Sequence, residues 1–180
     1  MRAAGVGARP ISLEVRRIRA DEGPRLRALR LHALADAPTA FGSTLAREEA
    51  FPDSLWHERA ARGASGGDGV TFIAEQDGRW VGLATGLAED PEGPKPSGPV
   101  LVGMFVDGAE RRHGAGAALV EGVAAWARAR GAVRLSLWVT AGNEPAIALY
   151  RKCGFRATGE TKPLAHTPAL AELRMVRDLT

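Results

Sequence analysis

The fold of this chain is decided by the stretch Val100-Leu101-Val102-Gly103-Met104-Phe105-Val106 and the turn Arg111-Arg112-His113-Gly114-Ala115-Gly116 that follows it. The first run is apolar on consecutive residues, which is typical of a strand covered on both faces. The turn is basic, contains glycine and precedes a helical pattern. A helix N-terminus offers unpaired N–H groups and partial positive charge, and glycine lets an anion approach closely. The turn therefore predicts a phosphate site, although alone it also fits a purely structural turn.

The segments after this turn predict a parallel strand pair. A helix is expected from Gly116 to Arg130, with apolar residues at helical spacing and Gly131 as its stop. Residues 133–139 then alternate apolar with other side chains, as a strand does. A strand, a crossover helix and a second strand form a right-handed parallel unit. The turn then lies at the carboxyl edge of the sheet, where ligands of open α/β sheets bind.

Upstream of residue 100 the pattern predicts helices followed by a hairpin. A strand at 13–19 leads to a helix capped by Asp21 and running through Leu34. The second helical stretch, 39–62, is interrupted at Pro52, with Asp53 as a cap and Gly63 as its end. Strands at 70–74 and 80–87 flank Asp77-Gly78, a strong hairpin signal.

Downstream of residue 140 the pattern predicts one short helix and a final hairpin. Asn143 caps the helix, Pro145 fits its first turn and Gly154 ends it. Strands at 155–158 and 170–176 are expected to pair across a loop that contains Pro163 and Pro168. Residues 90–99 are expected to form a surface loop, since they hold several prolines and glycines.

The composition indicates one soluble domain. The chain has 180 residues, of which 45% are hydrophobic and 25% charged, so we expect a loose tail over residues 1–10 and one domain over 11–180. No run approaches the roughly 20 apolar residues of a membrane helix, and no secretory signal is evident, so a cytoplasmic protein without a membrane partner is expected. The net charge of +3 is scattered, which argues against a nucleic-acid partner.

Cysteine and histidine usage predicts no metal site. Cys153 is the single cysteine, which excludes an intramolecular disulfide and a zinc site built on several cysteines. A nucleophilic role for Cys153 is formally open, but no histidine is near it in sequence and it fits buried filler better. The histidines are scattered without ligand spacing: His32, His57, His113 and His166.

Two polar residues of the short helix point to the same place as the turn. Asn143 and Tyr150 are seven residues apart, close to two helical turns, so they share one side of the helix. If the two strand-to-helix junctions are neighbours in the sheet, the turn at 111–116 and this side of the helix flank one cleft of cofactor size.

At this point the sequence resembles the GCN5-related N-acetyltransferase superfamily. That family's phosphate motif, Gln/Arg-x-x-Gly-x-Gly/Ala, is matched by Arg111, Gly114 and Gly116, and the segments 142–150 and 154–155 resemble its asparagine-to-tyrosine helix and following Gly-Phe. The resemblance runs from Leu13 to Asp178 and is strongest over 100–155. It implies an α/β (α+β) fold: a single domain with a mixed, mostly antiparallel sheet, a splayed parallel central strand pair and flanking helices.

The resemblance also implies acetyl-CoA as the acetyl donor. Backbone groups near Phe105 and Val106 would contact its pantetheine arm, N–H groups from Arg112 through Ala117 would hold its pyrophosphate, and Asn143 would contact the arm from the other side. Basic side chains of the turn would add contacts to phosphates. The implied binding residues are Phe105, Val106, Arg111, Arg112, His113, Gly114, Ala115, Gly116, Ala117, Asn143 and Tyr150.

The chemistry that the family implies is direct attack by a neutral amine on the thioester. A backbone N–H near Phe105 or Val106 would stabilise the oxyanion, and Tyr150 would protonate the leaving thiolate as the catalytic acid. The general base stays open, because strand 100–106 lacks the carboxylate that several members carry there. Glu75, Asp107 or a chain of water molecules are the alternatives. Arg112 stands where many members have glycine.

The acceptor implied is a primary amine of a small molecule or a peptide, and its identity cannot be read from the sequence. Acidic residues at 48–58 would attract a cationic amine, or they form a solvated helix face. A non-catalytic acyl-CoA-binding sensor is the alternative function, since the strand carboxylate is missing. Dimers are frequent among similar proteins, so a homodimer is possible.

Overall fold

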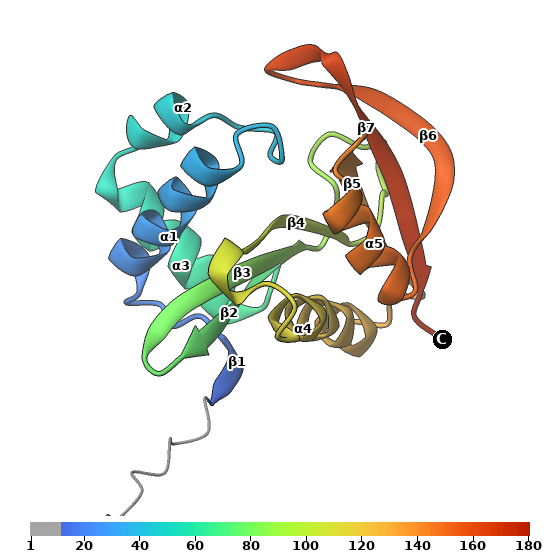
Figure 1. Cartoon of the computed structure of the whole chain (residues 1–180). Coiled ribbons are helices and arrows are strands. Elements are labelled where there is room, and N and C mark those ends of the chain that lie inside the picture. The colour runs from blue at the N-terminus through green and yellow to red at the C-terminus, as the bar shows by residue number, and fades with distance from the viewer. Residues whose placement is uncertain (1–11) are drawn as a thin grey trace, which may run out of the picture.

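The strands form one twisted sheet, in the order β1-β2-β3-β4-β5-β7-β6. The computed structural model describes residues 12–180, and the predicted tail at 1–10 lies outside them. Figure 1 shows the elements. In chain order they are β1 Leu13–Arg17, α1 Gly23–Asp36, α2 Leu45–Glu49, α3 Asp53–Ser65, β2 Gly69–Gln76, β3 Arg79–Leu87, β4 Val100–Val106, the 3-10 turn Gly108–Glu110, α4 Ala115–Ala129, β5 Arg134–Thr140, α5 Glu144–Lys152, β6 Arg156–Leu164 and β7 Thr167–Asp178.

The central pair, β4 and β5, is parallel, and the other neighbouring strands in the described chain run antiparallel. The two central strands pair at Val100 with Ser136 and at Leu101 with Leu137. Beyond Leu101 no strand of the described chain pairs with this edge of β4, so the two strands diverge. The predicted mixed sheet with a splayed parallel pair is therefore confirmed.

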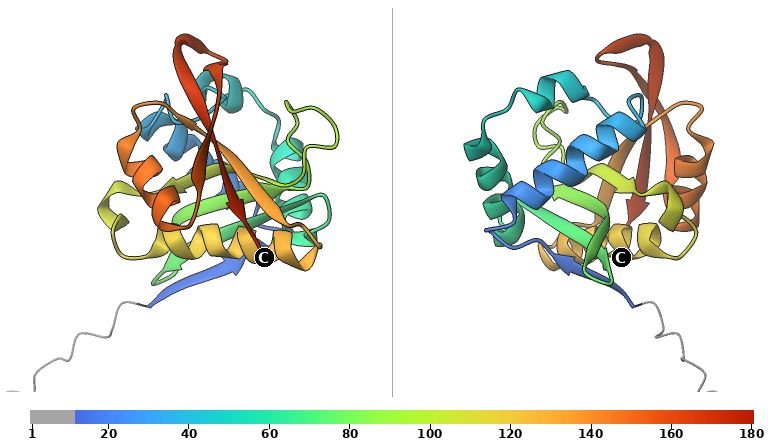
Figure 2. Two further views of the ribbon diagram at one scale, coloured as in Figure 1. Left: turned by 90° about the vertical axis from the view of Figure 1, so that its right-hand side faces the viewer. Right: turned by 60° about the vertical axis from the view of Figure 1, so that its left-hand side comes forward.

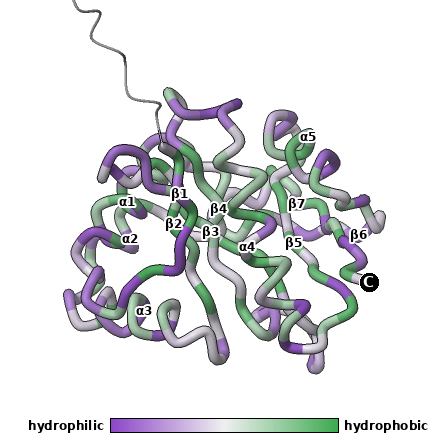
Figure 3. The backbone as a smooth tube through the Cα atoms, turned by 90° about the horizontal axis from the view of Figure 1, so that it is seen from below, coloured by the Kyte–Doolittle hydropathy of each residue, from purple (hydrophilic) through white to green (hydrophobic). Residues whose placement is uncertain are grey.

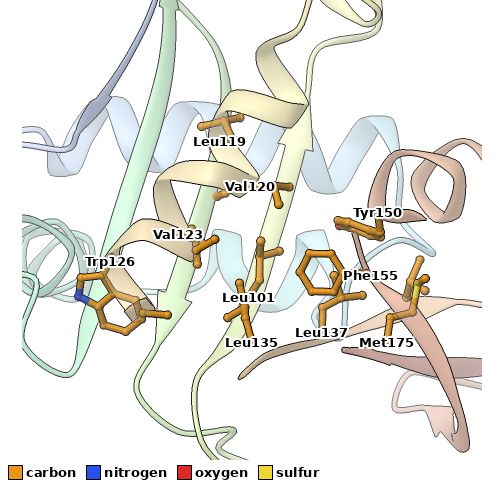
Figure 4. Packing of buried hydrophobic residues seen from close by; sticks show 14 of the residues in the cluster. Leu101, Leu119, Val120, Val123, Trp126, Leu135, Leu137, Tyr150, Phe155 and Met175 are labelled. Carbon is orange, nitrogen blue, oxygen red and sulfur yellow. The ribbon is translucent and has the colours of Figure 1, made fainter. Parts of the chain in front are cut away.

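Two hydrophobic cores cover the two faces of the sheet. The first packs α4 and α5 on one face, and the second packs α1 and α3 on the other (Figure 2). On α4, Leu119, Val120 and Val123 recur at helical spacing and are fully buried, and they belong to the same cluster as Leu101 and Leu137 (Figure 4). Figure 3 shows the hydrophobic colouring concentrated around α4 and the strands beneath it.

Local backbone chemistry confirms several predicted boundaries. Asp77 and Gly78 both have positive φ, 50° and 79°, which is the geometry that an Asp-Gly hairpin turn requires. Asn143 caps α5, because its side chain accepts a hydrogen bond from the N–H of Ala146. Gly131 follows α4 with φ 80°, as expected of a glycine just past a helix end.

The predicted helix boundaries near Asp21, Asp53 and Gly63 are wrong. The cap of α1 is Glu22, without a side-chain cap bond, because that carboxylate instead accepts from Arg16 and from the N–H of Arg19. Asp53 is the first residue of α3 rather than its cap, and α3 continues to Ser65, with Gly66 as its C-cap at φ 69°. Gly63 lies inside α3, where glycine lets the helix pack closely on β2: a Cβ there would come within 2.7 Å of Thr71 Oγ1.

The last hairpin is longer than the predicted strands at 155–158 and 170–176. Strands β6 and β7 run on to Leu164 and back from Thr167, so Pro163 and Pro168 lie within strands and not in a loop. Strand β6 is the edge of the sheet, where proline is tolerated because one row of N–H groups needs no partner strand. Figure 2 shows the hairpin rising above the rest of the molecule.

Across the described part of the chain, none of the helices has the length and apolar character needed to cross a membrane.

Candidate functional site

The divergence of β4 and β5 opens a cleft of about 390 Å³. Its floor is β4, through Val102, Gly103 and Met104. Helices α1, α2 and α3 line one side, while the loop after β3 and strands β6 and β7 line the other. Trp138 from β5 and Tyr150 from α5 complete it. The cleft thus lies between the helical layer and the final hairpin, which Figure 1 shows on opposite sides of β4.

A bulge in β4 determines which backbone groups face this opening. The register against β3 shifts between the partners of Leu83 and Thr85, and Gly103 has φ 61°. The N–H of Asp107 donates to the carbonyl of Val81 on β3, at 2.8 Å. Because successive backbone groups of a strand alternate in direction, those of Phe105 point to β3, while those of Met104 and Val106 point to the opening. The opening therefore faces Val106 and not Phe105.

The turn after β4 presents an open helix N-terminus. Gly114, with φ 87°, is the cap of α4 and supplies no side chain, and no acidic residue lies in the first turn. The intrahelical ladder starts with the N–H of Ala118, which donates to the carbonyl of Gly114. The N–H groups of the preceding residues, 115–117, are free of intrahelical partners. This geometry suits an anion at the surface of the turn.

The basic side chains of this turn are not equivalent. Arg111 Nε donates to the carbonyl of Val106, at 3.0 Å, and its Nη2 lies 3.3 Å from Asp36 Oδ2. Arg111 therefore ties the turn to the end of β4 and to α1, and its guanidinium is already engaged. Arg112 is exposed and has φ 75°. His113 is exposed as well, with Nδ1 3.7 Å from Glu110.

Helix α5 brings its two predicted residues to different surroundings. Gly116 lets the first turn of α4 approach α5, since a Cβ there would lie 2.9 Å from Leu149 Cδ2. The side chain of Asn143 caps α5, with its Oδ1 3.4 Å from the N–H of Ala146. Tyr150 is buried and packs edge-on against Phe155, with ring centroids 5.9 Å apart (Figure 4). Burial raises the pKa of the Tyr150 hydroxyl above its ordinary value.

Tyr150 is the predicted site residue that lines the cleft within the described chain. The turn at 111–117 and Asn143 lie outside the cleft lining. The turn adjoins the cleft at Met104, since a Cβ on Gly116 would lie 3.4 Å from Met104 Cε. The site is therefore built as two adjoining parts: a half-enclosed cleft that reaches Tyr150, and an exposed helix N-terminus.

Two side chains proposed as alternatives for the base are engaged elsewhere. Glu75 is held by Arg16, with Nη2 2.9 Å from its Oε2. Asp107 accepts from the N–H of Ala109 and lies 3.6 Å from Arg79. Neither lines the cleft in the described chain. The carboxylates that do line it are Glu48, Asp90, Glu92 and Glu172.

These cleft carboxylates differ in their electrostatics. Burial raises the pKa of Glu172 above its ordinary value, although Lys162 opposes the rise. For Glu48, burial is outweighed by the hydrogen bond and charge of Arg30 and by the charge of Arg59, so its pKa is lowered. For Asp90, burial is outweighed by the hydrogen bonds from the Trp138 indole and the Glu92 N–H together with nearby positive charge, and its pKa is lowered too. Glu172 is thus the one among these three that protonates most readily.

The sequence did not single out Glu172. It lies on β7 opposite Thr140 in the register with β5, far along the chain from the motifs of residues 100–155. Glu172 lies between Ala171 and Leu173, and polar residues fall on both faces of β7. The sequence therefore does not distinguish a glutamate that faces the cleft from one that faces solvent. Its place in the cleft lining, on a strand that pairs with β5, shows that this carboxylate faces the cleft.

Comparison with protein families identifies the architecture. The model of the acetyltransferase (GNAT) family matches residues 30–155, which is more than half of the chain. This chain is a GNAT acetyltransferase-family member. The matched region contains β4, the turn, α4, β5 and α5, which are the elements that form the site. A search of curated proteins finds no match.

Solved structures of similar shape include several acetyltransferases. A GNAT acetyltransferase from Streptococcus pneumoniae has a TM-score of 0.76 at 22% identity, over 94% of this chain and all of that one. The putative acetyltransferase YncA from Salmonella typhimurium, solved with acetyl-CoA, has a TM-score of 0.76 at 16% identity, over 94% and 95%. A ribosomal-protein-alanine N-acetyltransferase from Brucella melitensis has a TM-score of 0.71 at 27% identity, over 92% and 99%.

Proposed function

We propose that this protein transfers an acetyl group from acetyl-CoA to a primary amine by direct attack. One observation carries the proposal: the parallel pair β4–β5 opens beyond Leu101 between an uncapped helix N-terminus and a cleft that contains Tyr150. A CoA thioester needs this combination, since its phosphates are anionic, its arm is extended and its reacting end is small. The amine acceptor is a small molecule or the amino group of a peptide.

The residues present fit acetyl-CoA. The N–H groups of residues 112–117 are proposed to hold the pyrophosphate, with Gly114 and Gly116 allowing close approach. The pantetheine amides are proposed to pair with the edge of β4 that faces the opening, at Met104 and Val106, and with Asn143 from the other side. Arg112 and His113 add positive charge at the phosphates, whereas Arg111 holds the turn in place through Val106 and Asp36.

Acetyl-CoA supplies an acetyl thioester whose carbonyl is open to attack by a neutral amine. A β4 N–H that faces the opening is proposed to stabilise the negative charge on the carbonyl oxygen. The Tyr150 hydroxyl is proposed to give its proton to the departing CoA thiolate. The support for this assignment is the place of Tyr150 in the cleft lining; its hydroxyl is protonated at neutral pH, as a proton donor must be, although burial raises its pKa and so makes it a weaker acid.

The incoming ammonium must lose a proton before it attacks. Glu75 and Asp107 do not line the cleft, so we propose that Glu172 accepts this proton, with water as the relay. Its raised pKa brings this carboxylate closer to the value that general-base catalysis at neutral pH favours.

A thiol-release assay tests the proposed function. CoA thiol is measured while acetyl-CoA is supplied with a broad amine library, and Tyr150→Phe removes only the hydroxyl. We expect turnover with at least one amine, and a loss of about 100-fold or more in kcat for Tyr150→Phe. Arg156→Gln, on the outer strand β6, is the matched surface control and should keep wild-type turnover. Unchanged kcat in Tyr150→Phe would remove the hydroxyl from the mechanism.

The same assay separates the enzyme from a non-catalytic acyl-CoA sensor. Both functions predict that acetyl-CoA raises the melting temperature. Thiol release with an amine identifies the enzyme, while tight binding without release from any amine identifies the sensor. No thermal shift with acetyl-CoA would contradict both.

A further inference from the structure

Arg30 carries an unused hydrogen-bond donor inside the cleft. It lies on α1, and its side chain is 14% exposed. Its Nε and Nη2 grip Glu48, with Nη2 2.9 Å from Oε1, and its guanidinium lies over the Phe41 ring at 4.6 Å. Its Nη1 is buried and has no hydrogen-bond partner among the described residues. Arg30 is therefore held by Glu48 and by the Phe41 ring, with the N–H donors of Nη1 left unpaired among the described residues.

The free Nη1 of Arg30 lies beside the β4 bulge. A Cβ built on Gly103 would have Arg30 Nη1 as its nearest neighbour, at 3.8 Å. Gly103 is part of the cleft floor, between Val102 and Met104. The unused donor is thus next to the segment of β4 whose backbone faces the opening. A ligand group bound by Arg30 would therefore lie beside Gly103 in the cleft.

A second unpartnered donor lines the same cleft. Trp56 on α3 is 1% exposed, and its indole N–H has no hydrogen-bond partner among the described residues. Leaving a buried donor unpaired costs about 1–3 kcal/mol, and more for a charged group. Arg30 and Trp56 both lie on the helical side of the cleft. Two such donors on one wall indicate that a hydrogen-bond acceptor belongs there.

The charge of the two cleft walls differs in sign. The charged residues of the helical wall are three arginines, Arg30, Arg59 and Arg62, and one carboxylate, Glu48. Glu48 is ionised because Arg30 and Arg59 lower its pKa. On the opposite wall the charged residues are Asp90, Glu92, Glu172 and Lys162. The helical wall is therefore net positive and the opposite wall net negative. A ligand with a negative and a positive end matches this polarity.

We propose that the acceptor is an amino acid, that is, a primary amine that also carries a carboxylate. The carboxylate accepts hydrogen bonds from Arg30 Nη1 and the Trp56 indole, and the ammonium lies toward the wall that contains Glu172. Glu48 acts as a positioning residue, because it holds the other two nitrogens of Arg30. This inference rests on the proposed acetyltransferase function and names its acceptor class.

The first test compares ligands on the unaltered protein. CoA release is measured with the common amino acids, with their carboxamides and with the corresponding decarboxylated amines. We expect free amino acids to exceed both analogues of the same side chain by about 30-fold or more in kcat/KM, the effect of one charged hydrogen bond. Equal turnover of amino acids and decarboxylated amines overturns this inference and leaves the acetyltransferase function standing. No release from any amine contradicts the function itself.

The second test uses Arg30→Met, which keeps much of the apolar stem over Phe41 and removes the guanidinium. We expect KM for the preferred amino acid to rise about 30-fold or more, with kcat/KM for its decarboxylated analogue unchanged. Arg134→Met, at an exposed ion pair on β5 outside the cleft, is the control for loss of one positive charge. An equal loss with both ligands would show that Arg30 only neutralises Glu48. If Arg30→Met fails to fold, the ligand comparison decides.

Discussion

Arg112 has a left-handed backbone, with φ 75°, a conformation that favours glycine. A non-glycine residue there carries a conformational cost that glycine avoids, so its side chain needs a compensating role. Among residues 12–180 Arg112 has no ion-pair partner, while Arg111 beside it is engaged with Val106 and Asp36. Of the two arginines, Arg112 is the one available to a phosphate.

Substitutions of Arg112 distinguish the effect of its charge on acetyl-CoA affinity from the effect of its backbone conformation on stability. In Arg112→Gly and Arg112→Asn the left-handed conformation is retained, so the free energy of unfolding should change by no more than about 1 kcal/mol. The dissociation constant for acetyl-CoA should rise about 3-fold or more at low salt and approach the wild-type value at high salt, where exposed charges are screened. Calorimetric titration at two salt concentrations measures this. Equal affinity at low salt would show that Arg112 does not contact phosphate.

Glu172 is expected to set the acidic limb of the pH profile. Burial raises its pKa above the ordinary 4.5, and the base must be ionised, so kcat should fall as the pH is lowered through that raised value. Glu172→Gln should lower kcat by about 100-fold and abolish the limb. Glu92→Gln, an exposed carboxylate of the same wall, is the comparison and should keep the limb. A limb that persists in Glu172→Gln would assign the base elsewhere.

At the scale of elements, β3 and β4 approach each other through Gly82. A Cβ at this position would lie 2.8 Å from the Phe105 carbonyl oxygen, which is backbone and cannot rotate away. The absence of a side chain on Gly82 lets β3 pair with Phe105, and this pairing leaves Met104 and Val106 facing the opening. A glycine in the neighbouring strand therefore lets β3 and β4 pair closely beside the bulge.

Gly82→Ala should destabilise the protein by about 1–3 kcal/mol, because the added methyl group overpacks this contact. Gly42→Ala is the matched control: no atom lies within 4 Å of a Cβ there, so alanine should be neutral or slightly stabilising. Urea unfolding of the two variants gives the comparison. Equal stability of both would mean that β3 and β4 separate at little cost.

The elements of residues 69–154 could be predicted because their signals are local. Asp77-Gly78 fixes a hairpin, Asn143 caps a helix, and apolar spacing defines α4. The boundaries that failed depend on distant partners. Gly63 reads as a helix end, but it is a packing site against Thr71, and Pro163 reads as a loop residue although an edge strand accepts it.

The two halves of the candidate site differed in the same way. The turn at 111–116 and Tyr150 were named from motifs, because their spacing along the chain carries the information. Glu172 and the donor of Arg30 were not named, since each acquires its role from a residue far away in sequence: Thr140 in the register of β7 with β5, and Gly103 beside the guanidinium. No spacing rule reports such contacts.

At the scale of the whole molecule, the buried carboxylates predict loss of stability in acid. The hydrogen bond from Arg16 lowers the pKa of Glu22, and the pKa values of Glu48 and Asp90 are lowered as well. Each contributes stability that is present above its unfolded pKa and is lost as the pH falls through its folded value. Glu172, with a raised pKa, acts in the opposite direction.

We therefore expect the free energy of unfolding in urea to fall as the pH is lowered below about 4.5. Glu48→Gln should flatten part of this slope. At pH 7 it should cost about 3–5 kcal/mol, because Arg30 and Arg59 would keep their buried charges without a counter-ion. Glu160→Gln, at an exposed pair with Arg174, should cost less than about 1 kcal/mol. Stability that is constant down to pH 3 would contradict the ion-pair account.

The short pairing of β4 with β5, at Val100 and Leu101, makes the opening the weakest seam in the molecule. Strands β1 to β4 form one panel and β5 to β7 another, and in the described chain no backbone pairing joins β4 to β5 beyond these two positions. Helix α4 and side-chain hydrogen bonds such as that from Trp138 to Asp90 supply the other links. An acetyl-CoA molecule bound along this opening would contact both panels and would link them for as long as it stays bound. A ligand at about 100 times its dissociation constant adds about 2.7 kcal/mol to the stability of the state that binds it. The free energy of unfolding then depends on the concentration of acetyl-CoA. As that concentration falls from well above the dissociation constant, the protein loses stability before the reaction slows.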